Sequence, residues 1–203
     1  MNDIRVTLIP EKNHSIIVDI DGTIANVDER LGRALEIAGV TTKIVNDKYN
    51  FYRDNRRFTF YEELFNPEAM LALDTPIDGA VKKLDMLSKF FTIFYVTSRP
   101  KDDDNEDTYD ATAKWLENNN FPDGVLLMRP RMQKRCSFVT SAFSELQENG
   151  YQLVLAFDDL FDGRAEYEAF GIKVVEIVDE SWDIPNICMD KDGAEICIDM
   201  GDE

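Results

Sequence analysis

The chain alternates short apolar runs with stretches whose apolar positions recur at helical spacing. The runs are almost continuously hydrophobic, as is typical of parallel strands that are buried on both faces. We predict strands at 15–20, 91–97, 125–128, 152–157 and 173–178. Helical spacing predicts helices near 28–39, 78–89, 107–119, 138–149 and 163–170. This alternation indicates the α/β class, with a Rossmann-like parallel sheet flanked by helices.

Residues 40–76 fit the alternation poorly and are rich in aromatic side chains. We predict a single domain over 1–203 with a small insert here, which is either a cap over one end of the sheet or a helical excursion with its own satellite core. The arginines at 53, 56 and 57 either contact a nucleotide or form a solvated face. Near the end of the chain, the sequence DKDG at 190–193 favours a hairpin turn over a calcium loop.

The composition narrows the range of partners and compartments. The 203 residues carry a net charge of -18, from 22 basic and 40 acidic side chains, which repels nucleic acid and anionic membranes at long range. No apolar run is long enough to cross a bilayer, and the first residues lack the pattern of a signal peptide. Three scattered cysteines predict reduced thiols rather than a disulfide, and a single histidine argues against zinc. We therefore expect a cytoplasmic protein that does not associate with membranes.

Polar residues follow three of the predicted strands. They are Asp19-Ile20-Asp21-Gly22-Thr23 after the first, Thr97-Ser98-Arg99 after the second and Asp158-Asp159 after the fourth. In a parallel sheet the carboxyl ends of the strands gather ligands, so we expect these groups to meet in one crevice. Paired carboxylates at a buried strand end are costly unless something compensates their charge. The sequence predicts a metal ion and a phosphate as that compensation.

The residue types at these strand ends suit phosphoryl transfer. Asp19 is placed to attack phosphorus and form an aspartyl-phosphate. Mg²⁺ prefers hard oxygen ligands, which Asp19 with Asp158 or Asp159 would supply. Asp21 lies two residues on and points along the same face, where it could protonate the leaving oxygen and then activate water. Gly22 permits a tight turn, and Thr97 could donate a hydrogen bond to the phosphoryl group.

Three of these motifs resemble the haloacid dehalogenase (HAD) superfamily of phosphohydrolases. They are VDIDGT at 18–23, VTSR at 96–99 and FDD at 157–159, and the resemblance covers roughly 15–178. More narrowly, the chain is similar to the 3′-phosphatase domain of phage polynucleotide kinase and its stand-alone relatives. The segments that carry this likeness are DTYDATAKWLENN at 107–119, LLMRP at 126–130, FYEELF at 60–65 and LDTPIDGA at 73–80.

The resemblance implies a Mg²⁺-dependent phosphatase that works through an aspartyl-phosphate. Asp19 would be the nucleophile, and Asp21 the acid/base whose carbonyl also ligates the metal. Asp159 would be a metal ligand with Asp158 close by, and Thr97 would contact phosphate. The substrate-binding candidates are Gly22, Thr23, Ser98, Arg99, Arg129 and Arg135. For Arg99, an ion pair with a neighbouring acid is an equal alternative to anchoring phosphate.

One position departs from the family pattern. The family places a lysine or arginine at the start of the helix before the fourth strand, about where this chain has Ser141. The nearest cations are Lys134 and Arg135, and we favour Lys134 as the catalytic cation. If neither reaches the site, the barrier would rise by roughly 3 kcal/mol through the loss of one charge stabiliser.

The leading hypothesis is hydrolysis of a phosphomonoester, either on a small nucleotide or at a nucleic-acid 3′ end. The charge favours the small molecule, while the narrower resemblance favours the 3′ end. The alternative is an inactive or slow HAD-like protein that binds phosphate or a partner. A phosphomutase or dehalogenase is a third possibility, and Asp21 argues against dehalogenation, which needs no proton donor. The sequence does not determine the oligomeric state.

Overall fold

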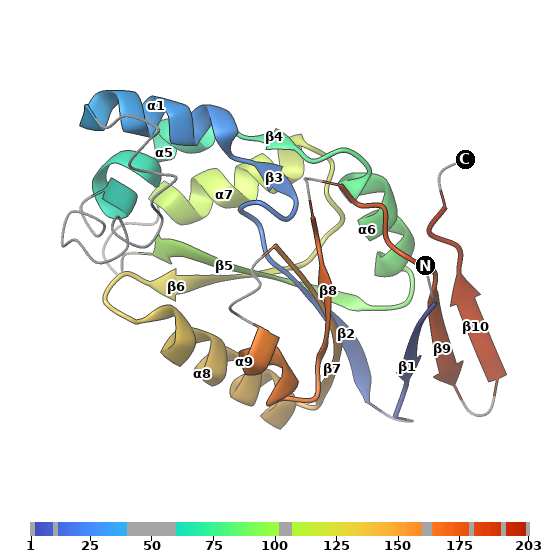
Figure 1. Cartoon of the computed structure of the whole chain (residues 1–203). Helices are drawn as coiled ribbons and strands as arrows, with labels where there is room; N and C mark the ends of the chain where they lie inside the picture. Colours follow the sequence, from blue (N-terminus) through green and yellow to red (C-terminus); the bar gives the residue numbers. More distant parts are fainter. Residues whose placement is uncertain are drawn as a thin grey trace.

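A five-stranded parallel sheet forms the centre of the computed structural model (Figure 1). The structure describes residues 3–9, 12–39, 60–101, 107–159, 164–178, 181–191 and 194–201. The strand order is β6-β5-β2-β7-β8. The strands are β2 (Asn13–Val18), β5 (Thr92–Lys101), β6 (Val125–Pro130), β7 (Tyr151–Asp158) and β8 (Lys173–Glu176). All neighbouring pairs run parallel, which confirms the predicted fold class.

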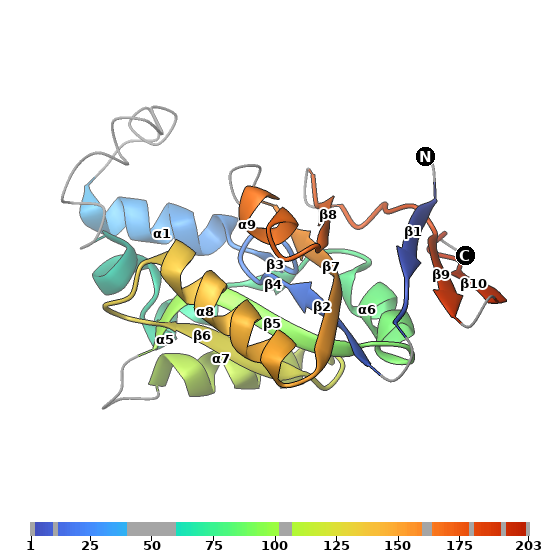
Figure 2. The same ribbon diagram turned by 90° about the horizontal axis from the view of Figure 1, so that it is seen from below.

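Helices cover both faces of this sheet, and each face has its own apolar core (Figures 1 and 2). On one face pack α6 (Ala80–Ser88) and α7 (Asp107–Asn118), through side chains such as Leu84 and Trp115. On the other pack α8 (Arg135–Glu148) and α9 (Arg164–Glu168), through Phe143 and Tyr167. Trp115 is thus a core residue. The predicted helix at 138–149 begins earlier, at Arg135, which places that arginine in the first turn.

A group of short elements follows the first strand of the sheet. Strands β3 (Ala25–Asn26) and β4 (Thr75–Pro76) pair antiparallel and bring the two ends of this region together. Between them lie α1 (Asp28–Ala38), the π-helical segment η1 (Phe60–Phe65) and α5 (Glu68–Leu71).

These short elements have a core of their own. Phe60 and Phe65 pack with Ala34 and Leu35 in a separate cluster, as the satellite-core interpretation expects. Residues 40–59, with the three arginines of the predicted patch, lie outside the described residues. A cap therefore stays a prediction.

A second, three-stranded sheet joins the start of the chain to its end. Strand β1 (Ile4–Thr7) runs parallel to β9 (Ile187–Lys191), and β9 pairs antiparallel with β10 (Ala194–Ile198). The predicted hairpin is confirmed by this pairing, although residues 192–193 of its turn lie outside the described part. Ile187 and Met189 are buried in the core that also contains α6 and α7. This sheet lies beside β2 and α6 in both views (Figures 1 and 2).

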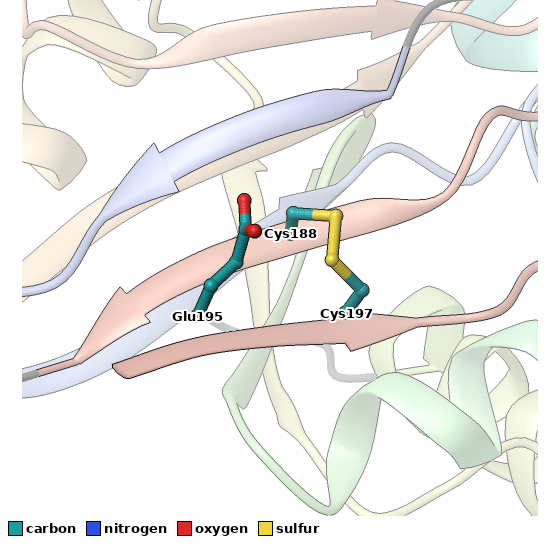
Figure 3. Close-up of side chains that lie close together, drawn as sticks. All are labelled: Cys188, Glu195 and Cys197. Carbon is teal, nitrogen blue, oxygen red and sulfur yellow. A yellow bond between two sulfur atoms is a disulfide. The ribbon is translucent and has the colours of Figure 1, made fainter. Parts of the chain in front are cut away.

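The prediction of reduced cysteines is wrong for two of the three. Cys188 on β9 and Cys197 on β10 stand opposite each other, with Cα atoms 4.0 Å apart, and form a disulfide (Figure 3). The two cysteines meet because β9 and β10 pair antiparallel, which places their side chains directly opposite each other. The number of cysteines in the sequence does not reveal this pairing. Glu195 lies beside the disulfide and is paired with Arg5. Because the two sulfur atoms are bonded to each other, they cannot serve as thiolate ligands for a metal ion.

The disulfide bears on the expected compartment. Disulfides persist mainly in oxidising environments, so this one does not favour the cytoplasm, and that location stays a prediction. Among the residues that the structure describes, no helix combines the length and the apolar character needed to cross a membrane.

Replacing both disulfide cysteines, Cys188→Ser with Cys197→Ser, should lower the free energy of unfolding by about 2–3 kcal/mol. The reason is that the bond closes a short loop and thereby restricts the unfolded chain. Urea denaturation with and without a thiol reductant measures the change. Cys136→Ser, at the exposed free cysteine, is the control and should shift stability by less than about 0.5 kcal/mol. Equal stability of the wild type in oxidising and reducing buffer would contradict the assignment.

Candidate active site

The loop after β2 folds into a tight turn that carries two acidic side chains. The Asp19 N–H donates to the carbonyl of Phe157 at 3.0 Å, which ties the loop to the end of β7. Gly22 adopts a positive φ of 85°, and a Cβ added there would lie 2.3 Å from Asp159 Oδ2. The turn therefore requires glycine for two reasons, its backbone conformation and the close approach of Asp159.

Three carboxylates converge beside this turn. Asp19, Asp158 and Asp159 each offer an oxygen within 4.8 Å of the others. Burial, followed by repulsion from Asp158, raises the pKa of Asp19 well above its usual range, and the same causes raise the pKa of Asp159 to about 6. We call these three residues the carboxylate triad. For Asp19 and Asp159, burial and the neighbouring negative charges outweigh the nearby positive charge of Arg135.

One cation faces the triad from the first turn of α8. The Arg135 guanidinium lies 3.2 Å from Asp158 Oδ2 and 3.0 Å from Glu166. Asp158 is fully buried and also accepts a hydrogen bond from the Tyr167 hydroxyl. Lys134, which we favoured from the sequence, is the exposed N-terminal cap residue of α8. The structure thus brings Arg135 to the triad, and Ser141, one and a half turns on, is exposed.

A hydroxyl group links two members of the triad. Thr23 Oγ1 lies 3.4 Å from Asp19 Oδ2 and accepts the backbone N–H of Asp159 at 3.1 Å. The Thr23 side chain is fully buried. Its position between the two chain segments fixes the spacing of Asp19 and Asp159.

Asp21 belongs to a second cluster of charges. Arg99 Nη2 lies 2.6 Å from Asp21 and 2.8 Å from Asp74, while Arg30 pairs with Asp21 and, at 2.9 Å, with Asp74. The Arg30 guanidinium also lies over the Phe65 ring, 4.0 Å from its centroid. We call the four charged residues the arginine–aspartate cluster.

The two clusters shift the pKa values of the two aspartates of the loop, Asp19 and Asp21, in opposite directions. Burial alone would raise the pKa of Asp21, but Arg99 and Arg30 outweigh it and lower that pKa to about 2. Asp19, two residues earlier, has a raised pKa. The roles implied by the family resemblance need the reverse order, an ionised Asp19 and a protonated Asp21. Bound groups must therefore change both environments before those roles apply.

The remaining predicted site residues are placed as follows. Thr97 is buried, and its hydroxyl accepts the N–H of Arg99 at 3.2 Å, whereas Ser98 is exposed. Arg99 forms ion pairs with Asp21 and Asp74, and a contact with phosphate stays a prediction. Arg129 donates to the carbonyls of Ser98, Arg131 and Gln133, so its guanidinium holds the loop after β6.

Sequence reasoning missed Arg30 and Asp74 of the arginine–aspartate cluster, and Tyr167, which donates to Asp158 of the triad. Arg30 belongs to a helix that begins just after the loop. A lone arginine on the inward face of that helix was the signal that could have revealed its role. Asp74 lies in the segment LDTPIDGA that carries the narrower resemblance, but its partners Arg30 and Arg99 are remote along the chain, so its role was not apparent. Tyr167 is nine residues from Asp158, and its sequence neighbourhood gave no signal of the contact.

The triad has the donor set that a hard divalent cation requires. Three carboxylates supply oxygen ligands of the kind Mg²⁺ prefers. Burial, and then repulsion from neighbouring carboxylates, raises the pKa of Asp19 and of Asp159, and a bound cation would offset both effects. Asp19, Asp158 and Asp159 are the residues that would hold it, Asp158 while also bonded to Arg135 and Tyr167.

Comparisons with known proteins agree with the fold. No family model and no curated protein sequence matches the chain. A chain of the Pnkp1/Rnl/Hen1 complex is similar in structure, with a TM-score of 0.56 at 14% identity. The match covers 83% of this chain and 47% of that one, so this chain spans about half of the length of that relative.

Two further solved structures are similar over most of this chain. The tungstate-bound class C acid phosphatase from Bacillus anthracis has a TM-score of 0.51 at 19% identity, covering 82% of this chain and 67% of that one. A HAD family enzyme from Bacteroides thetaiotaomicron, in complex with magnesium and inorganic phosphate, has a TM-score of 0.50 at 12% identity, covering 84% and 98%. The chain therefore has a HAD-like fold, as its motifs predicted.

Asp74→Asn should destabilise the protein by about 3 kcal/mol at pH 8, because it leaves two buried guanidinium groups facing one carboxylate. Burial raises the pKa of Asp74 to about 6, against the opposing effect of Arg30 and Arg99. As pH falls through 6, the folded wild type takes up a proton that the unfolded chain does not yet bind, so the wild type gains stability, whereas the variant has no group that titrates there. The loss should therefore be larger at about pH 5 than at pH 8.

Chemical denaturation at the two pH values measures this difference. The matched control is Glu36→Gln, which removes an exposed partner of Arg33 and should change stability by less than about 0.5 kcal/mol. A wild-type-like Asp74→Asn at both pH values would show that the arginine–aspartate cluster contributes nothing to folding.

Proposed function

We propose that the protein is a Mg²⁺-dependent phosphomonoester hydrolase that works through an aspartyl-phosphate on Asp19. The observation that carries the proposal is the carboxylate triad with Arg135 beside it, at the carboxyl ends of β2 and β7. The HAD-like fold and the phosphatases that share it support the same reaction class. A bound divalent cation would neutralise charge between the triad and the phosphoryl oxygens.

In the first step, a carboxylate oxygen of Asp19 forms a bond to phosphorus as the ester oxygen leaves. Asp21 gives its proton to that oxygen. In the second step, water attacks phosphorus while Asp21 takes the water's proton, so that phosphate is released and Asp19 is regenerated.

Asp21 must hold a proton in this scheme, whereas Arg30 and Arg99 keep it ionised. A phosphorylated substrate would compete for the same guanidinium groups, because they bind phosphate oxygens as well as carboxylates. Competition of this kind would release Asp21 and raise its pKa toward the value that the proton transfer needs.

The predicted substrate is a nucleotide or the 3′-phosphate of a polynucleotide. The structural likeness to a chain of an RNA repair complex supports the second. The net charge of -18 favours small substrates, and any binding of a polymer must use a local patch of positive charge. The cytoplasmic location expected from the sequence stays a prediction, which the Cys188–Cys197 disulfide does not favour.

Asp19→Asn should abolish phosphate release, because an amide cannot form the acyl phosphate. The assay uses p-nitrophenyl phosphate and, separately, an oligonucleotide with a 3′-phosphate, each with Mg²⁺ and with chelator. Wild-type release should stop in chelator and return with added Mg²⁺. A variant as active as the wild type would refute the mechanism. A protein that binds beryllofluoride yet releases no phosphate from either substrate would instead be the inactive phosphate-binding alternative.

Arg135→Met should lower kcat by about a hundredfold, or about 3 kcal/mol, because it removes the cation that faces the triad. Lys134→Met removes the neighbouring exposed charge and should leave kcat within about twofold of the wild type. Steady-state kinetics at saturating Mg²⁺ compare the two variants, with thermal melts to confirm folding. A larger loss in Lys134→Met than in Arg135→Met would restore the assignment that the sequence favoured.

A further inference from the structure

Trp182 lies far along the chain from the predicted motifs, yet it packs behind the candidate active site. It belongs to the connection between β8 and β9, outside the five-stranded sheet. Its side chain is 1% exposed, and its ring stacks on Phe157, with centroids 4.9 Å apart and an angle of 23°. Phe157 immediately precedes Asp158, the last residue of β7, so the indole supports the strand end where Asp158 and the following Asp159 lie.

The indole also contacts the other chain segment of the triad. Its N–H donates to the carbonyl of Thr23 at 2.7 Å. The hydroxyl of the same threonine lies next to Asp19 and accepts the N–H of Asp159. One buried hydrogen bond therefore separates Trp182 from the residue that fixes the spacing of two metal-ligand candidates.

Trp182 is itself held from the opposite side. The buried ammonium group of Lys83, on α6, donates to the Trp182 carbonyl. The ring is thus fixed by stacking, by its N–H and by its main chain. A side chain that is held this rigidly can fix the position of Thr23, whereas a mobile side chain could not.

We propose that Trp182 is a positioning residue for the divalent cation, acting through Thr23 on the spacing of Asp19 and Asp159. The proposal rests on the proposed function. Three carboxylates that repel one another tend to move apart, and Mg²⁺ demands near-octahedral geometry. An outer residue that holds them together lowers the cost of binding the cation, as groups behind metal ligands commonly do.

The test measures binding of Mn²⁺ alone, through the electron paramagnetic resonance signal of the free ion, with Mg²⁺ as a competitor. Trp182→Phe keeps an aromatic ring against Phe157 but loses the N–H. Its dissociation constant for Mn²⁺ should rise about tenfold. The Mg²⁺ concentration for half-maximal phosphate release should rise in parallel, while KM for p-nitrophenyl phosphate at saturating Mg²⁺ stays within about twofold of the wild type.

Trp115→Phe is the matched control. Trp115 is also buried, stacks on Phe121 and donates its N–H to a backbone carbonyl, that of Asp74, at 3.0 Å. This carbonyl belongs to a residue of the arginine–aspartate cluster and not to the triad, so the control should lose stability without weakening Mn²⁺ binding. If both variants weaken binding equally, the effect is general destabilisation and the proposal is overturned.

A double-mutant comparison tests the route through Thr23. In a Thr23→Val background the hydroxyl is absent, so adding Trp182→Phe should cause little further loss of Mn²⁺ affinity. Additive losses would overturn the route. If Trp182→Phe does not fold, 3-benzothienylalanine at position 182 retains the shape of indole, lacks the N–H and should give the same tenfold loss.

The measurements distinguish failure of the metal site from failure of the role proposed for Trp182. A wild-type protein that binds no Mn²⁺ refutes the metal site and, with it, the proposed function. A wild-type protein that binds Mn²⁺ with the same affinity as Trp182→Phe refutes only the role of Trp182.

Discussion

Repulsion among Asp19, Asp158 and Asp159 is the constraint around which this end of the molecule is built. Their oxygens lie within 4.8 Å of one another around the fully buried Asp158, and the raised pKa values of Asp19 and Asp159 express the cost of burial and repulsion together. Folding brings them together because their strands lie side by side, with Asp19 bonded to the main chain of Phe157. The fold therefore holds the carboxylates in an arrangement that favours binding a cation.

A second group of charges balances itself without help from a ligand. Arg30 and Arg99 face Asp21 and Asp74, so two positive and two negative side chains share a buried volume. This neutrality keeps Asp21 ionised, whereas Asp19, only two residues away, is not stabilised in its charged form. The loop after β2 thus lies between the arginine–aspartate cluster, whose charges balance, and the carboxylate triad, which carries excess negative charge. The chemistry we propose occurs between these two groups.

The two ends of the chain form the second sheet, and the segment that leads into it contacts the candidate active site. Strand β1 comes from the beginning and the β9–β10 hairpin from the end, and a disulfide closes the hairpin. The connection that leads into β9 carries Trp182, which contacts both Phe157 and Thr23. Tertiary packing in this way joins a late segment to the first motif of the chain.

The sequence by itself determined the parallel sheet, its helices and the meeting of three strand ends. Apolar runs that are buried on both faces leave a strong pattern, and parallel strands carry their carboxyl ends to one edge whatever their order. Asp19, Asp21, Asp158 and Asp159 were predictable for that reason. Only the tertiary structure decided the partners of these aspartates, because Arg30, Asp74 and Tyr167 reach them from other elements through side-chain packing. It also decided which of Lys134 and Arg135 contacts Asp158, since a helix that begins at Arg135 turns that residue toward Asp158 and leaves Lys134 exposed. Spacing along the chain does not encode such choices, which depend on where a helix begins and on which side chains share a buried volume.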